Sequence, residues 1–419
     1  MSTLQEVGPL GSAVELPPSS HVVVVNRWRE RYAEYADYID HRQHRVTYVS
    51  TEVGLASVPE SAADVFLVKA TDDLAEVTAA VDDLVRRHGE PTRIVALKED
   101  DLLVGAALRE RWNVPGPRTE QVLPFRDKLV MVTAVARAGL PVPGFAPAPD
   151  ADSVLAFAEA HGWPVVVKPT TGSSSLGVVR VDGPAELAGL CFEEGPYLVQ
   201  TFNPHPIFHV DGSFDGDSVS VVRTSRYLNN CMDFRGGTVL GSVEESDPRT
   251  QQLVADFAGR VLHALTDRPT VFHLEVFVDR ESGSCTFLEI GARVGGAEIP
   301  LLWREVHRLD LMEVAFRNQL AQPPAVIPPL GDDEVGGWLL VPAPERRPCR
   351  ITEVTSMVGQ SPGPYAEAVL EPGDVLPEAD SYYEHVGGRF RFRGASTIAV
   401  EEAIQRTAAA FRVEAKPLL

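Results

Sequence analysis

Strands and helices alternate between residues 21 and 112, and this alternation constrains the fold more than any other feature of the sequence. Short β-branched runs predict strands, and segments with apolar residues at helical spacing separate them. We expect strands at His21–Val25, Arg45–Val49, Ala63–Val68 and Arg93–Leu97, and helices at Arg27–Ile39, Asp72–Arg87 and Glu99–Trp112. The pattern predicts an α/β fold that starts with a doubly wound parallel sheet. A GxGxxG motif is lacking here, so a dinucleotide site is not expected.

Composition limits the classes of partner. The chain has 419 residues, of which 44% are hydrophobic and 23% charged, as in ordinary globular proteins. Its 38 basic and 59 acidic residues give a net charge of −21. Such an acidic surface repels a phosphate backbone, so we expect no nucleic-acid partner. No apolar run reaches the ~18 residues that a membrane helix needs, and residues 1–20 look like a flexible leader rather than a signal peptide. We therefore expect a cytoplasmic protein without a membrane partner.

The rest of the chain changes character after a rigid linker at Val114–Arg118. Helices are expected at 124–138, 249–265, 297–307 and 310–318, and short strands between 163 and 217. Pro269–Val278 and Ser284–Ile290 look like adjacent antiparallel strands joined by a turn. Prolines between 323 and 329 mark a boundary, and the last stretch mixes strands with a helix near Val400–Phe411.

Val165–Gly177 (VVVKPTTGSSSLG) is the first candidate for a functional motif. A β-branched strand delivers Lys168 to a loop that contains Gly172, Gly177 and the serines Ser173, Ser174 and Ser175. Glycines permit backbone angles closed to other residues, so such a loop can lay N–H groups on a phosphate beside the lysine charge. Taken alone, the motif is equally compatible with a flexible surface hairpin.

Two glutamates in the predicted strand pair are the second candidate. Glu275 lies in FHLEVFVD and Glu289 in CTFLEIGARVGG. A charged residue inside an apolar strand is costly unless it is paired or binds a metal, and carboxylates without a His or Cys cluster suit Mg²⁺. The alternatives are that both face solvent, or that one pairs with Arg293. Lys128, in FRDKLVM, and Arg293 by themselves would be an exposed helix lysine and a turn arginine.

The combination of these motifs is more specific than any part. In chain order it resembles the ATP-grasp superfamily, and within it the carboxylate–amine ligases that include the L-amino-acid ligases. The resemblance extends from His21 to about Val413. It implies that Lys128 and Lys168 bind the nucleotide and that Gly172–Gly177 forms a lid over the phosphates. It also implies a hinge at Tyr197–Phe202 that binds adenine.

The resemblance implies further roles. Glu275 and Glu289 would bind Mg²⁺, with Mn²⁺ as a second possibility, and Arg293 would stabilise the transferred acyl phosphate. Two positions depart from the family pattern, which often has Glu at Gln200 and Asn at Gly291, so two-metal occupancy is left open. Within the hinge, Thr201 and Phe202 accompany Gln200 as expected ATP contacts, and His209, in FHVDG, resembles a strand residue near the nucleotide.

By this resemblance the chain divides into a leader at 1–20, a Rossmann-like domain at 21–118, an ATP-grasp domain at 119–322 with a lid lobe at about 141–202, and a C-terminal α+β region at 323–419. The implied activity is ATP-dependent ligation of a small carboxylate, with an amino acid as one substrate, and a small amine. Two alternatives remain: carboxylation of an amine or acylation of a natural-product scaffold, and a non-catalytic ATP-binding module. No motif fixes the substrates, and a homodimer is left open. We expect specificity to come from the Leu228–Pro248 loop and the C-terminal region.

Overall fold

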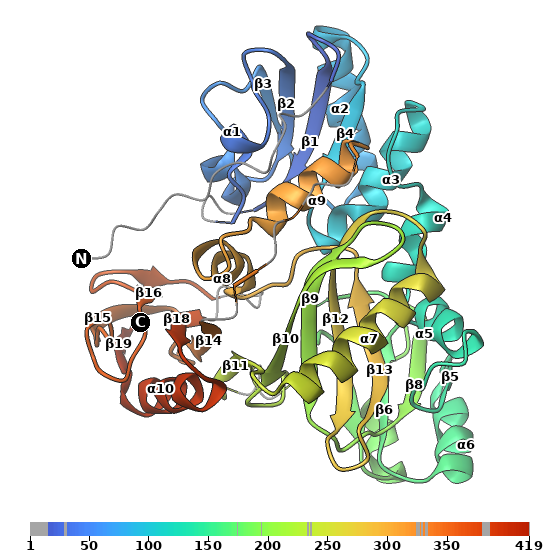
Figure 1. Ribbon diagram of the computed structural model, residues 1–419, viewed down its shortest axis with the longest axis vertical. Helices are drawn as coiled ribbons and strands as arrows, with labels where there is room; N and C mark the ends of the chain where they lie inside the picture. Colours follow the sequence, from blue (N-terminus) through green and yellow to red (C-terminus); the bar gives the residue numbers. More distant parts are fainter. Residues whose placement is uncertain are drawn as a thin grey trace.

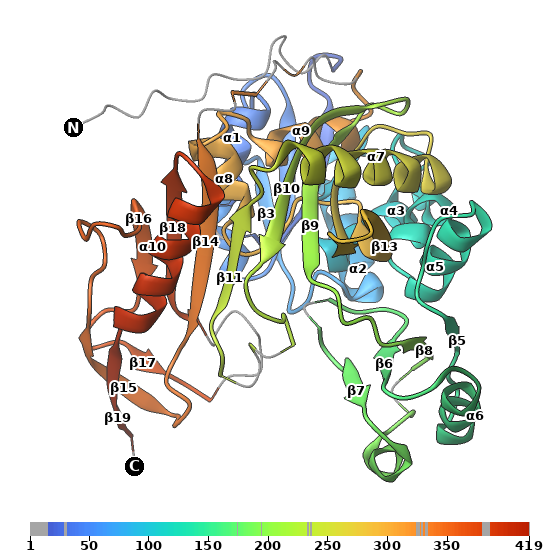
Figure 2. The ribbon, with the colours of Figure 1, turned by 60° about the horizontal axis from the view of Figure 1, so that its bottom comes forward.

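Figure 1 shows the computed structural model with its elements labelled. The structure describes residues 16–28, 32–173, 175–193, 195–232, 234, 237–323, 327, 330–331, 334–378 and 386–418. An N-terminal unit lies above a long antiparallel sheet, and a smaller sheet and a C-terminal layer flank that sheet at its two ends (Figures 1 and 2).

The N-terminal unit contains a parallel sheet, as the alternation predicts. Its strand order is β3-β2-β1-β4, and every neighbouring pair runs parallel. The strands are β1 (His21–Asn26), β2 (Arg45–Ser50), β3 (Asp64–Leu67) and β4 (Arg93–Ala96). All six residues of β1 are buried, which explains its continuous apolar sequence, because a parallel sheet is covered on both faces.

Helices cover both faces of this sheet. One face packs against α2 (Leu74–His88) and α3 (Leu102–Arg111). The other packs against α1 (Tyr35–Tyr38) and against α9 (Leu311–Gln319), which comes from far along the chain (Figure 1). The core of the N-terminal unit is therefore shared with the second half of the protein.

The helix expected at 27–39 is wrong in extent. Among the described residues of this stretch only α1 is helical. The side chain of Asn26 accepts hydrogen bonds from the Trp28 backbone nitrogen at 3.1 Å and from the Tyr35 hydroxyl at 3.0 Å. These bonds hold Trp28 and Tyr35 against the end of β1. Trp28 and Tyr32 join the core from outside α1, and Tyr35 and Tyr38 join it from within α1.

A separate four-stranded sheet carries the lysine-containing strand. Its order is β5-β8-β6-β7, and all its pairs are antiparallel. The elements are β5 (Phe145–Pro147), α6 (Ala151–His161), β6 (Val165–Pro169), β7 (Val179–Val181) and β8 (Tyr197–Thr201). Figure 2 shows this sheet projecting below the main sheet, with α6 beside it.

The long sheet has eight strands in the order β13-β12-β9-β10-β11-β14-β18-β16. Its members are β9 (Ile207–Phe214), β10 (Val219–Tyr227), β11 (Leu240–Glu244), β12 (Thr270–Asp279), β13 (Ser284–Gly291), β14 (Val335–Pro342), β16 (Ala366–Val369) and β18 (Val386–Gly394). The amphipathic α7 (Pro248–Leu265) and α5 (Lys128–Arg137) pack on the β9–β12–β13 part of it. Strands of the C-terminal region thus continue the sheet that carries Glu275 and Glu289.

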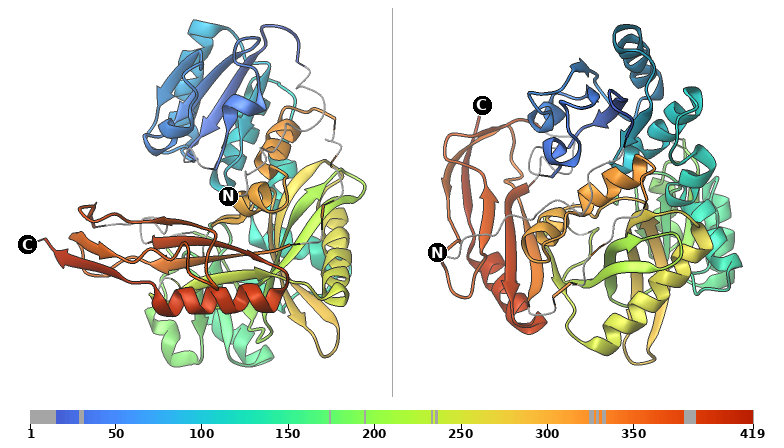
Figure 3. Two further views of the ribbon diagram at one scale, coloured as in Figure 1. Left: turned by 60° about the vertical axis from the view of Figure 1, so that its left-hand side comes forward. Right: turned by 45° about the horizontal axis from the view of Figure 1, so that its top comes forward.

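The remaining elements complete the C-terminal layer and the connections. A small sheet pairs β15 (Cys349–Val354) with β17 (Val375–Leu376) and β19 (Val413–Pro417). Helix α10 (Thr397–Ala410) covers β14 and β18, and α8 (Ile299–Glu305) lies next to α9, as the side view in Figure 3 shows. Within the described residues, no helix combines the length and the apolar character needed to cross a membrane.

Candidate functional site

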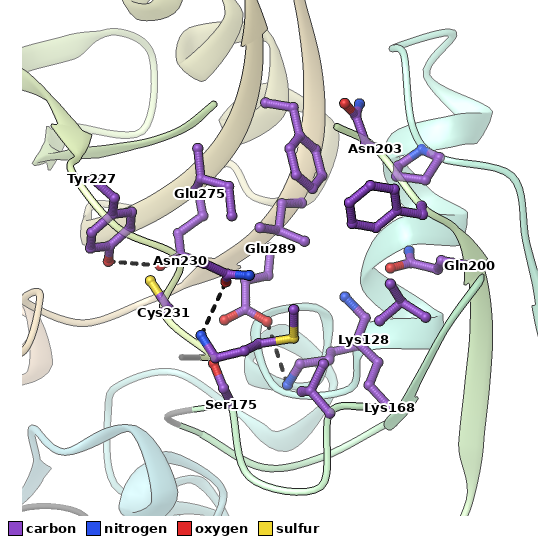
Figure 4. A pocket seen from close by; sticks show the side chains of 18 of the residues that line it. Lys128, Lys168, Ser175, Gln200, Asn203, Tyr227, Asn230, Cys231, Glu275 and Glu289 are labelled. Carbon is purple, nitrogen blue, oxygen red and sulfur yellow. Dashed lines mark hydrogen bonds and ion pairs between the residues drawn. The ribbon is translucent and has the colours of Figure 1, made fainter. Parts of the chain in front are cut away.

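A cavity of about 440 Å³ lies between the small four-stranded sheet and the β12–β13 strand pair. Figure 4 shows that Lys128, Lys168, Glu275 and Glu289 point into this region from different elements. The sequence-predicted residues that line the cavity are Lys128, Lys168, Gly172, Ser173, Ser175, Gln200, Thr201, Phe202, Glu275 and Glu289. The fold thus brings residues from between positions 128 and 289 together around one cavity.

Lys128 occupies the first position of α5. The Asp127 side chain starts this helix by accepting hydrogen bonds from the next backbone nitrogens, Leu129 and Val130. The backbone nitrogen of Lys128 donates to the Thr170 carbonyl at 2.7 Å, which ties the helix start to the end of β6. Its Nζ donates to the Gly172 carbonyl at 3.0 Å and lies 3.7 Å from Glu289 Oε2. The lysine therefore bridges the glycine loop and the β13 carboxylate.

Lys168 stands on β6 and is 3% exposed. Burial lowers the pKa of its ammonium group to about 8, with the attraction of Glu289 opposing this shift and the repulsion of Lys128 adding to it. A buried ammonium group facing a cavity is costly without an anion beside it. The two lysines and the cavity together form a site that favours a polyanionic ligand.

The loop after β6 has the backbone angles that its glycines suggest. Gly172 and Gly177 have φ of 134° and 70°, and Ser175 has φ of 55°. A Cβ on Gly177 would lie 2.9 Å from Pro169 Cγ, so this position accepts only glycine without a shift. Ser173 Oγ donates to Asp100 of the N-terminal unit at 3.5 Å. Ser174 lies outside the described residues.

The predicted hinge, Tyr197–Phe202, consists of β8 and the residue that follows it. Gln200 is buried in the small sheet, where it is paired with Val166 on one side and Phe145 on the other. The Gly144 nitrogen donates to Thr201 Oγ1 at 3.0 Å, and the Arg180 guanidinium lies 4.4 Å from the Phe202 ring centroid. Gln200, Thr201 and Phe202 all line the cavity beside the two lysines.

Glu275 and Glu289 are directly paired across β12 and β13, and a bulge follows Glu275. Their carboxylates lie on the same face because cross-strand partners project together. Both line the cavity, so neither sits on an outer face of the hairpin. The Tyr227 hydroxyl donates to Glu275 Oε1 at 2.8 Å (Figure 4). Burial raises the pKa of Glu275, but contacts with His273 and Tyr227 outweigh it and hold the pKa below its usual range.

A buried hydrogen-bonded chain lies behind Glu275. His209 Nε2 contacts Ser242 Oγ at 2.7 Å, and its Nδ1 contacts Asp211 Oδ2 at 2.6 Å. The other oxygen of Asp211 contacts His273 Nδ1 at 2.8 Å, and His273 Nε2 lies 3.6 Å from Glu275 Oε1. The chain links the interior of the sheet to a carboxylate of the cavity and restrains its orientation.

Two groups of side chains have the composition of a metal site. One is the Glu275–Glu289 pair, whose oxygens face a cavity and match the ligands that Mg²⁺ prefers. The other is the cluster of His209, Asp211 and His273. Both oxygens of Asp211 already accept hydrogen bonds from these histidines, so we interpret this cluster as a network that supports Glu275.

His209 does not line the 440 Å³ cavity. It is 2% exposed and packs beneath that cavity against Tyr227 and Trp338. Neither His273 nor Tyr227 is among the site residues predicted from the sequence. The two-residue period of a strand places His273 on the same face as Glu275. In the Leu228–Pro248 segment expected to set specificity, Leu228 to Met232 line the cavity.

Arg293 forms an ion pair with Glu99 of the N-terminal unit. Its Nε donates to Glu99 Oε2 at 2.8 Å, and its Nη2 lies 2.6 Å from the same oxygen. Arg126 Nη1 lies 2.8 Å from the other oxygen of Glu99. Burial raises the pKa of Glu99, but the two arginines dominate and lower it to about 2. Glu99 and Arg126 carry no local sequence signal, because their partners lie far along the chain.

The fold is shared with solved structures of ligases and synthetases. The solved structure of an L-amino acid ligase from Bacillus licheniformis superimposes with a TM-score of 0.74, covering 95% of this chain and 99% of that one at 17% identity. N5-carboxyaminoimidazole ribonucleotide synthetase from Thermotoga maritima superimposes with a TM-score of 0.66, covering 94% and 99% at 14% identity.

Two sequence relatives carry the names of a ligase and a formyltransferase. The L-arginine-specific L-amino acid ligase of Bacillus subtilis is 24% identical over 276 residues, which is 62% of this chain and 65% of the relative. A formate-dependent phosphoribosylglycinamide formyltransferase of Synechococcus is 38% identical over 125 residues, 27% of this chain and 31% of the relative. The chain thus matches less than two thirds of the length of either relative. No family model matches the chain.

Proposed function

We propose that this protein is an ATP-dependent carboxylate–amine ligase that forms an amide or peptide bond between small substrates, one of them an amino acid. The observation that carries the proposal is the pairing of Glu275 with Glu289 across β12 and β13, opposite Lys128 and Lys168 in one cavity. Two carboxylates and two lysines around one space suit a metal-bound polyphosphate. The relatives named as amino-acid ligases support the same activity.

The proposed nucleotide site uses both sides of the cavity. Lys128 and Lys168 would hold the phosphates, the Gly172–Gly177 loop would cover them, and Gln200, Thr201 and Phe202 would surround the adenine. His209 would act from beneath the cavity through its contact with Asp211. Glu275 and Glu289 would hold Mg²⁺, or Mn²⁺ with the same oxygen ligands, and the bound ion would supply positive charge against the phosphates.

The proposed reaction has two steps. A carboxylate oxygen of the first substrate attacks the γ-phosphorus of ATP, and the bond to ADP breaks to leave an acyl phosphate. The amine then attacks the acyl carbon, loses a proton, and releases inorganic phosphate. Arg293 would donate hydrogen bonds to the acyl-phosphate oxygens, and the lysines would stabilise the charge on the transferred group. The protein's contribution is mainly the positioning of reactants and the exclusion of water.

We also propose that the chain divides into a Rossmann-like domain at 21–118, an ATP-grasp domain at 119–322 with a lid lobe at about 141–202, and a C-terminal α+β region at 323–419. The proposed partners are small carboxylates and amines, without nucleic acid or membrane. A homodimer remains compatible with the proposal, since one structural neighbour is a biotin carboxylase domain described as a dimer.

The test is release of ADP and phosphate from ATP and Mg²⁺ with pooled amino acids, followed by pairs. Lys168→Met tests the site, because it removes a lysine of the cavity. Lys69→Met, which removes an exposed lysine, is the matched control. Release of ADP that depends on amino acids, and that is lost in Lys168→Met but not in Lys69→Met, would support the proposed ligase activity. AMP and pyrophosphate as products would contradict the acyl-phosphate route.

Carboxylation of an amine is the second candidate, because structural neighbours include biotin carboxylase and carboxyaminoimidazole ribonucleotide synthetases. ADP release that requires bicarbonate and an amine, with no second carboxylate, would favour it. Nucleotide binding without turnover under any of these conditions would indicate a non-catalytic module.

A further inference from the structure

A second, smaller cavity lies where the N-terminal unit meets the first residues of β12 in the long sheet. Its volume is about 60 Å³, and α3, α9 and the loop before β12 contribute to its lining. A cavity needs about 10–15 Å³ to hold one water molecule. This space therefore has room for several waters or for one small polyatomic ion. Ala292, which lines it, directly precedes Arg293 of the proposed active site.

Arg109 forms the floor of this cavity and is 1% exposed. Its guanidinium donates to the Ile94 carbonyl at 2.9 Å, to the Pro117 carbonyl at 3.2 Å and to the Gln319 side chain. A Cβ on Gly116 would lie 2.6 Å from Arg109 Cδ, so the arginine stem is tightly enclosed. In the described part of the chain, no carboxylate forms an ion pair with this buried cation.

Two further arginines increase the positive charge instead of balancing it. Arg268 lines the cavity, and Arg118 donates from Nη1 to the Arg109 carbonyl at 2.7 Å. Burial lowers the pKa of Arg109 to about 9, and the charges of Arg118 and Arg268 act in the same direction. Neither Arg118 nor Arg268 has a carboxylate ion-pair partner among the described residues. Two guanidinium groups that line one small cavity, with a third on the Arg109 carbonyl, are unexpected in a chain with a net charge of −21.

Asn318 gives an independent indication of a ligand. It is on α9 and lines the same cavity, and its Nδ2 is buried without a hydrogen-bond partner within the described structure. A buried donor without an acceptor costs free energy, and such groups are uncommon in native proteins. An anion with several oxygen acceptors would satisfy this amide and balance the guanidinium groups at once.

We propose that the cavity bounded by Arg109, Arg268 and Asn318 binds a small oxyanion, either inorganic phosphate or the carboxylate of a small molecule. Arg268 contributes a guanidinium group to the lining, the amide of Asn318 supplies the neutral donor, and Arg109 supplies buried positive charge. A planar guanidinium fork matches the oxygens of either group. The site is separate from the proposed nucleotide cavity, with which it shares no lining residue.

The test is calorimetric titration with phosphate, and separately with acetate, at ionic strength matched with potassium chloride. Arg268→Gln removes one guanidinium from a half-buried position, and Arg406→Gln on α10 is the matched control, because it removes an exposed positive charge far from the cavity. Because a hydrogen bond to a charged group is stronger than one between neutral groups, Arg268→Gln should weaken binding at least about tenfold. Arg406→Gln should bind like the wild type.

A second variant and a site control make the test decisive. Asn318→Asp keeps the shape but replaces the donor with a negative charge, so it should also weaken anion binding about tenfold or more. The relative affinities for phosphate and acetate identify which of the two anions the site prefers. Lys168→Met should leave the binding intact. Loss of phosphate binding in Lys168→Met but not in Arg268→Gln would place the anion in the nucleotide cavity and overturn the proposal. The absence of any anion binding to the wild type would overturn it too.

Discussion

Two nitrogens of Arg293 contact a single oxygen of Glu99: Nε donates to it at 2.8 Å, and Nη2 lies 2.6 Å from it. Glu99 belongs to the N-terminal unit and Arg293 to the turn after β13, so the contact joins two parts of the chain that are 194 residues apart. It also fixes the plane of the guanidinium at a small pocket that Lys128 and Glu289 line as well. The role of Arg293 can therefore be tested from both partners.

Arg293→Ala should bind ATP nearly as well as the wild type but ligate at least ~100-fold more slowly. A preorganised donor to a developing oxyanion is typically worth about 3–4 kcal/mol of transition-state stabilisation. Arg293→Lys keeps the charge but loses the fork that Glu99 orients, so it should also be poor. ATP affinity, melting temperature and kcat measured on the same preparation separate binding from catalysis. A variant that loses stability and ATP affinity together, with kcat at saturation intact, would show that Arg293 only holds the turn.

Glu99→Gln should lower the free energy of unfolding by about 3 kcal/mol at neutral pH, because it removes a charge that two arginines stabilise. The two arginines lower the pKa of Glu99 from 4.5 to about 2 in the folded protein. A carboxyl group whose pKa is lower in the folded than in the unfolded protein stabilises the fold at pH values above its unfolded pKa. This stabilisation is lost as the pH falls through the folded pKa. The difference between wild type and Glu99→Gln should thus be constant above pH 4.5 and narrow toward pH 2. Urea unfolding across this range measures it, and a difference independent of pH would refute the ionic explanation.

Glu289→Gln should raise the Mg²⁺ concentration needed for half-maximal activity while leaving the fold intact. The substitution keeps the size of the side chain but removes one of the two negative charges proposed to hold the ion. Glu281→Gln, in the exposed turn of the same hairpin, is the matched control and should behave like the wild type. Normal turnover of Glu289→Gln at low Mg²⁺ would show that the metal assignment is wrong.

The parts of the site that sequence could predict are those set by local periodicity. Glu275 and Glu289 stand in two apolar strands separated by a short turn, and a hairpin brings such positions opposite each other. Lys168 follows a β-branched run and precedes glycines. This local pattern predicts a strand followed by a loop, whatever the rest of the fold is. The parallel order of β1, β2, β3 and β4 follows in the same way from alternation with helices.

The parts that sequence could not predict depend on contacts between distant segments. Glu99 looks like an ordinary acidic residue at a helix start, and only the docking of the N-terminal unit places it on Arg293 and Arg126. The extension of the long sheet by β14 and β18 is equally non-local, because their partners are set by tertiary packing. The helix after β1 is shorter than predicted, since Trp28 and Tyr32 reach the core from outside α1.

The loop at 168–180 should become protected from hydrogen exchange when an ATP analogue binds. The motivation is the pair of positive-φ glycines, Gly172 and Gly177, and the two contacts that hold the loop, from Lys128 and to Asp100. A loop that closes on the nucleotide exchanges slowly only in the closed state. Exchange measured with and without the analogue tests this, and residues 248–265 of α7 provide the internal control. Unchanged protection across 168–180 would argue against a lid.

ATP binding should be coupled to proton uptake by Lys168. Burial lowers the pKa of its ammonium group from 10.5 to about 8 in the free protein. Between these two values the unfolded chain binds more protons, so Lys168 makes the free protein more stable as the pH rises through this window. A bound polyphosphate acts in the opposite direction, because it stabilises the charged form and raises the pKa again.

Near pH 8 the free protein carries this proton in about half of its molecules, so ATP binding should take up about half a proton there and less at pH 6. ATP affinity should correspondingly fall as the pH rises above about 8. Calorimetric titrations in two buffers that differ in ionisation enthalpy measure the uptake directly. Lys168→Met should abolish the buffer dependence at pH 8, whereas Lys69→Met, which alters an exposed lysine, should preserve it. If the heat of ATP binding is independent of buffer in the wild type, Lys168 is already fully protonated in the free protein or does not contact the phosphates.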